Sequence, residues 1–61
     1  MAGTSTRART ELRDRVRRAN DELRAARAIV ETTPALRLRP GILADLLDAE
    51  LTSVEVLVRL R

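Results

Sequence analysis

The clearest structural signal in this sequence is the stretch 12–30, which reads LRDRVRRANDELRAARAIV. It contains no Gly or Pro and is rich in Ala, Arg, Glu and Leu, which are good helix formers. Its apolar side chains recur at alternating spacings of four and three residues, the heptad pattern of a helix that packs along one face. The positions of this predicted helix-packing seam are Leu12, Val16, Ala19, Leu23, Ala26 and Val30.

Outward from this stretch, a long helix is expected over residues 6–32. Residues 1–5 are small and polar, and we expect them to form a flexible N-terminus. Pro34 should end the helix, because it lacks a backbone N–H and disfavours helical geometry at the preceding residue. Residues 33–40 are then predicted to be an extended connector that lays two leucines on the core.

The remaining residues, 41–61, are predicted to form two short apolar helices, over about 41–50 and 53–60. The order of residues from Thr52 to Glu55 is that of a capping box, which starts a new helix. A strand over 53–60 is the alternative, because valines alternate there with other residues. The helix is favoured, since the capping signal is specific and a lone strand would have no partner. The predicted fold is all-α: a long N-terminal helix followed by two short helices that fold back as a helical hairpin or three-helix unit.

Charge is distributed unevenly along the chain. All twelve basic residues are Arg; residues 1–40 carry a net charge of +5, whereas residues 41–61 carry −2. A basic half joined to an acidic half can bind an anionic partner or pair with itself. A row of arginines shares one face of the long helix with no acid among them, and guanidinium groups bind phosphates and carboxylates well. The candidate anion or phosphate contacts are Arg13, Arg17, Arg24 and Arg27. This row has three possible interpretations. It is a solvated face, or it binds nucleic acid, or it binds an acidic protein surface such as the acidic half of a second copy.

The last third of the chain has more apolar surface than a 61-residue monomer can easily bury. We therefore expect another protein chain, including a second copy of this one, to cover it. The candidate partner surface consists of Leu46, Leu47, Leu51, Val54, Leu57 and Val58. The seam of the long helix allows two packings, one on the rest of the same chain and one on a second copy as a coiled-coil dimer.

The composition argues against catalysis. The sequence has no His, Cys or aromatic residue, so the commonest general base, thiolate zinc sites and base stacking are excluded. No Lys or His is present to activate a hydroxyl, and no Gly-rich phosphate loop occurs. We expect no enzyme activity, no metal and no cofactor. Because no apolar run approaches the roughly 18 residues of a membrane span, we expect no membrane partner and a cytoplasmic location.

The segment 51–60, LTSVEVLVRL, resembles the helix that follows the attachment site of acyl and peptidyl carrier proteins. The serine that carries the prosthetic group in that family would fall at Glu50, and the family's aspartate would fall at Ala49. The residues that carry the attachment chemistry are thus absent, and the resemblance implies no cofactor for this chain.

Two functions follow from these patterns. The first is a small non-enzymatic protein interaction module, such as a docking, adaptor or assembly piece, that self-associates. The alternative is a small DNA-binding regulator, with residues 40–60 as a helix-turn-helix and the arginine row on phosphates. The would-be recognition helix is poor in base-reading groups, and acids such as Glu55 would repel phosphate. An apolar segment that reaches Leu60 fits both a complete protein and the front part of a longer one.

Overall fold

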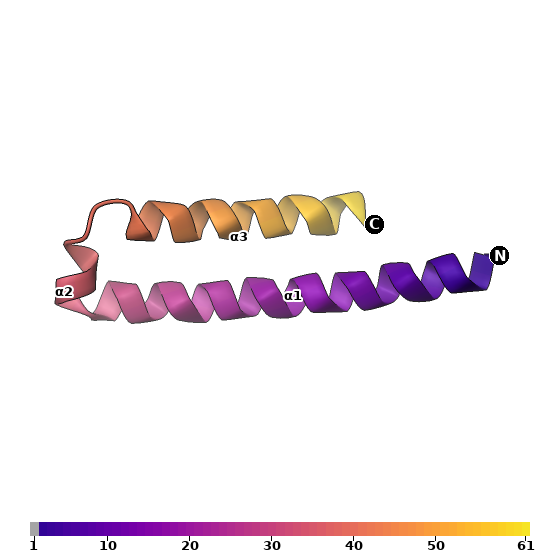
Figure 1. Cartoon of the computed structure of the whole chain (residues 1–61), viewed down its shortest axis with the longest axis horizontal. Helices are drawn as coiled ribbons and strands as arrows, with labels where there is room; N and C mark the ends of the chain where they lie inside the picture. The colour runs from indigo at the N-terminus through magenta and orange to yellow at the C-terminus, as the bar shows by residue number, and fades with distance from the viewer. Residues whose placement is uncertain (1) are drawn as a thin grey trace.

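The chain folds into a helical hairpin (Figure 1). The computed structural model describes residues 2–61, with side chains from residue 5 onward. Helix α1 (Ala2–Thr32) runs antiparallel to helix α3 (Ile42–Arg59), and the single turn α2 (Pro34–Arg37) lies at the bend. The all-α class, with a long first helix that packs against a later one, is confirmed.

The segment predicted to be a flexible N-terminus, residues 1–5, overlaps the start of α1. Residues 2–5 are the first turn of α1, and Met1 lies outside the described residues. Because α1 is much longer than α3, its first turns extend beyond the end of α3 (Figure 1). These turns have no neighbouring helix within the described chain.

The bend between the helices is more helical than predicted. Thr33 is extended, with φ −114° and ψ 101°, as expected for a residue before proline. Pro34 then occupies the first position of a helical turn, where its missing N–H costs no hydrogen bond. The prediction of an extended connector over 33–40 was therefore wrong. Of the two leucines assigned to the core from this segment, Leu36 is half-buried, but Leu38 is 84% exposed.

The chain enters α3 through Gly41, which has φ 91° and ψ −25°. A Cβ at this position would meet nothing within 4 Å, so the cost of a side chain is conformational and not steric. Gly41→Ala is expected to lower the free energy of unfolding by about 1–2 kcal/mol, the cost of left-handed backbone for an L-residue. Urea unfolding at one protein concentration should show a lower midpoint and an unchanged slope. An unchanged midpoint would mean that the bend can adopt another conformation at no cost.

The two short helices predicted over 41–50 and 53–60 are one continuous helix, α3. Thr52 does not cap a second helix. Its hydroxyl donates to the carbonyl of Asp48 at 2.9 Å, four residues earlier in the same helix. The alternative prediction, a strand over 53–60, was also wrong, because α3 continues to Arg59. A helix-turn-helix needs a turn near these residues, and the described chain has none between Ile42 and Arg59.

The hairpin has almost no interior. Among the described side chains, Val30, at 6% exposure, is the only buried apolar residue, and Ser53 is the only buried polar one. The accessible surface is 5088 Å², whereas a globular monomer of 6.8 kDa should expose about 3,950 Å². The difference is larger than the roughly 800 Å² that one partner contributes to a standard protein interface. The molecule, 51 × 15 × 11 Å, thus leaves exposed an area as large as one side of such an interface.

Candidate functional site

The contact between α1 and α3 uses a seam that is rotated relative to the predicted one. Its α1 positions form two interleaved sets with seven-residue spacing, all half-buried or buried: Val16, Leu23 and Val30, and Arg13, Asn20 and Arg27. Four of the six predicted seam residues, Val16, Leu23, Ala26 and Val30, lie in or beside this contact. Leu12, at 48% exposure, and Ala19 are exposed and lie outside it. The seam is rotated because α3 supplies polar partners, Ser53 and Glu50, to Asn20 and Arg27 of α1.

The centre of the seam is a small hydrogen-bond network around Ser53. The side-chain amide of Asn20 donates to Ser53 Oγ at 2.6 Å and lies 3.4 Å from the Glu50 carbonyl oxygen. Ser53 Oγ donates in turn to that carbonyl at 2.7 Å. The hydroxyl is therefore satisfied as both donor and acceptor. A shielded polar pair between two helices fixes their register, because any slip leaves it unpaired.

Arg27 is held by two carboxylates. Its Nε donates to Glu50 Oε2 at 2.6 Å and its Nη2 to Glu50 Oε1 at 3.2 Å, while Nη1 donates to Glu31 at 2.8 Å. The hydrogen bond with Glu50 is the largest cause that raises the pKa of Arg27 above its ordinary high value, followed by the one with Glu31. Arg27 therefore stays charged, and its guanidinium is occupied within the chain rather than open to phosphate.

The other three predicted anion contacts remain open. Arg17 and Arg24 are exposed and Arg13 is half-buried. None of the three forms an ion pair with any described side chain, since the ion pairs there involve Arg15 and Arg27. Their positive charge is thus available on the surface of α1 that adjoins α3.

The predicted apolar partner surface divides into two parts. Leu46 and Leu57 are half-buried. The other four side chains are 43% to 62% exposed and are spaced four, three and four residues apart, so they form one stripe along α3. We call this stripe the exposed row: Leu47, Leu51, Val54 and Val58.

The exposed row and the open arginines border the same face of the hairpin. Two shallow grooves run between them. The first is lined by Asn20, Arg24, Arg27, Leu47, Glu50, Leu51 and Val54. The second is lined by Arg13, Arg17, Val54, Leu57, Val58 and Arg61. This face therefore has an apolar ridge on α3 and a guanidinium edge on α1.

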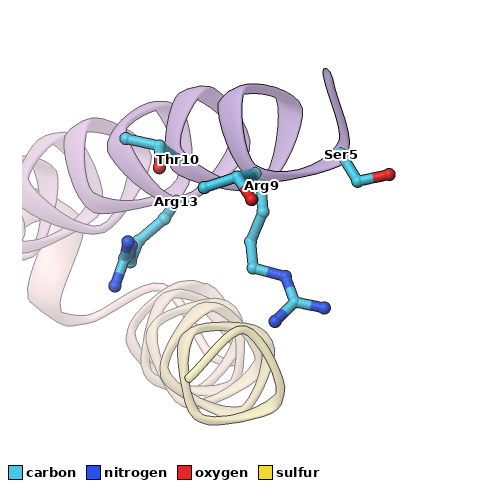
Figure 2. A pocket seen from close by; sticks show the side chains of 5 residues that line it. Ser5, Arg9, Thr10 and Arg13 are labelled. Carbon is cyan, nitrogen blue, oxygen red and sulfur yellow. The ribbon is translucent and has the colours of Figure 1, made fainter. Parts of the chain in front are cut away.

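A separate depression lies near the start of α1, lined by Ser5, Thr6, Arg9, Thr10 and Arg13. Figure 2 shows the long side chains of Arg9 and Arg13 extending from α1 on the side where α3 ends. All of its lining residues come from one helix, and none of them is buried. It is the open space beside the first turns of α1 and not a built binding site.

No family model matches this sequence, and no curated protein or solved structure is significantly similar to it. Within residues 2–61, no helix is both long and apolar enough to cross a bilayer. The same residues contain no cluster of three or more potential metal-binding side chains. The case for a functional site therefore depends on the geometry of the face described above.

Proposed function

We propose that this chain is a non-enzymatic protein interaction module that self-associates through the exposed row of α3 and the arginines beside it. The observation that carries the proposal is the row itself. Four aliphatic side chains, each at least 43% exposed, follow one another at heptad spacing along a helix of 18 residues. Such a stripe fits the side chains of a facing helix.

The amount of exposed surface supports a partner of substantial size. The hairpin alone buries one apolar side chain among those described, which is too little for a chain of this length to be stable by itself. Covering the exposed row would supply the apolar burial that the fold lacks. A second copy is a suitable partner, because it presents the same row at the same spacing.

Two observations weigh against the DNA-binding alternative. The continuous helix α3 offers no turn at which a recognition helix could be set across a first helix. Glu50 and Glu31 also neutralise Arg27, one of the four arginines assigned to phosphate. The guanidinium edge is left with three open members, and it borders an apolar ridge on α3.

Sedimentation equilibrium over a wide range of micromolar protein concentrations tests the proposal. We expect a mass that rises towards twice the 6.8 kDa of the chain. Helical circular dichroism should fall on dilution, because folding and association are linked. A well-folded monomer at every concentration would overturn self-association. If that monomer bound nonspecific duplex DNA with a steep salt dependence, the DNA-binding alternative would replace it.

A further inference from the structure

We infer that the partner on this face is a second copy in parallel orientation, with Arg17 and Arg24 of each protomer paired with Asp48 and Glu55 of the other. The inference rests on the proposed self-association and adds the orientation of the two copies and the contacts that select it. It follows from the charges on the two edges of the exposed row.

The two edges carry opposite charge. On the edge towards α1 lie the exposed guanidinium groups of Arg17 and Arg24. On the edge away from α1 lie the exposed carboxylates of Asp48 and Glu55, each next in sequence to a member of the row and so about 100° further around the helix. Within the described side chains, none of these four groups takes part in an ion pair. Arg59 also follows a member of the row and lies on the same edge as the two acids, at its C-terminal end, where the acids still outnumber it.

The spacing of the two pairs also matches. The two arginines are seven residues apart, as are the two acids, so each pair spans about 10.5 Å along its helix. The contacts of Asn20 with Ser53 and of Arg27 with Glu50 set the level of one helix against the other. In a parallel dimer, Arg24 of one protomer and Asp48 of the other are therefore within about one helical turn of each other along the helix axis. Arg17 and Glu55 are separated by the same distance along that axis. A guanidinium side chain can bridge that offset.

Symmetry then decides between the two orientations that bury the exposed row against itself. A two-fold axis parallel to the helices places the two α1 helices on opposite sides of the paired α3 helices, so the arginine edge of each protomer meets the acidic edge of its partner. A two-fold axis perpendicular to the helices places both α1 helices on the same side. Arginine then meets arginine and acid meets acid, which is unfavourable. Only the parallel dimer is complementary in charge.

Charge exchange tests the pairing. The variants Arg17→Glu/Arg24→Glu and Asp48→Arg/Glu55→Arg change exposed side chains that hold no ion pair in the hairpin. Each variant alone should self-associate at least tenfold more weakly than the wild type. An equimolar mixture should form a heterodimer, and the chain with all four changes should regain self-association. If each double variant associates as tightly as the wild type, the pairing is wrong.

Disulfide trapping tests the orientation independently. The sequence has no Cys, so Leu47→Cys and Val58→Cys each introduce the only thiol. In the parallel dimer each thiol faces the same thiol of the partner protomer. The two Cα atoms then lie within the roughly 4.4–6.8 Å that a disulfide needs. Both variants should then oxidise to linked dimers, whereas Arg18→Cys, at an exposed position of α1 outside the proposed interface, should not. Linkage only in a mixture of the Leu47 and Val58 variants would make the dimer antiparallel, which overturns this inference but leaves self-association intact. A monomer in sedimentation would overturn both.

Discussion

Replacing Leu51 by glutamate is expected to abolish self-association at micromolar concentration. Leu51 lies in the middle of the exposed row and is 62% exposed, so it contributes little to the contact between α1 and α3. Each dimer contains two copies of the change. Because burial of one leucine contributes about 1.5–3 kcal/mol, the loss is about 3–6 kcal/mol per dimer, or about two to four orders of magnitude in Kd. Sedimentation equilibrium measures this change directly.

Leu38→Glu is the matched control for this experiment. Leu38 is 84% exposed and lies at the bend, outside the exposed row. This variant introduces the same charge in place of the same apolar side chain and should sediment like the wild type. If Leu51→Glu remained dimeric, or if both variants dissociated equally, the exposed row would not be the interface.

Arg27→Met should have the second large effect, a loss of stability of the hairpin itself. The Glu50 side chain is only 12% exposed, and Arg27 supplies both of its ion-pair hydrogen bonds. Without the guanidinium, a carboxylate would stay largely shielded from water with no opposite charge beside it. The urea midpoint should fall several times further than for Arg18→Met, which removes an exposed arginine that holds no ion pair and lies outside the proposed interface. Both measurements need the same protein concentration, because the proposed dimerisation would also contribute to stability.

The double variant Arg27→Met/Glu50→Met shows whether the loss comes from the stranded charge. Removing both charges also removes the need to solvate either one, and apolar replacements of shielded ion pairs are often neutral or stabilising. The double variant should therefore be more stable than Arg27→Met alone. A midpoint that falls by the combined effect of the two single changes would mean that the groups are not coupled.

The sequence predicted the helices better than it predicted their contacts. Composition and the absence of Gly and Pro from 12–30 correctly indicated the long helix, and Pro34 marked its end to within two residues. The two-helix division of α3 was wrong because a capping box describes a possible helix start and not a required one. With no Gly or Pro from Ile42 to Arg59, the backbone could continue, and the Thr52 hydroxyl bonded to the preceding turn.

The rotation of the seam could not be predicted from apolar spacing alone. Asn20 and Arg27 belong on a solvated face by their polarity, yet each has a partner on α3. A signal was present in the seven-residue spacing from Arg13 to Asn20 to Arg27, which matches that of the apolar set containing Val16 and interleaves with it. This spacing indicates a helix contact only if Glu50 and Ser53 lie opposite Arg27 and Asn20. That arrangement depends on the register of the hairpin and not on the local sequence. The exposed row, in contrast, was part of the predicted partner surface.

The thinness of the hairpin determines how the protein responds to heat. The change in heat capacity on unfolding scales with the apolar surface that becomes exposed, and a rod of 51 × 15 × 11 Å with Val30 as the single buried apolar residue among those described has little such surface to release. A lone hairpin would therefore show a nearly straight dependence of the free energy of unfolding on temperature. Strong curvature in that dependence would instead indicate apolar surface buried between two copies, so calorimetry offers a further check on the proposed self-association.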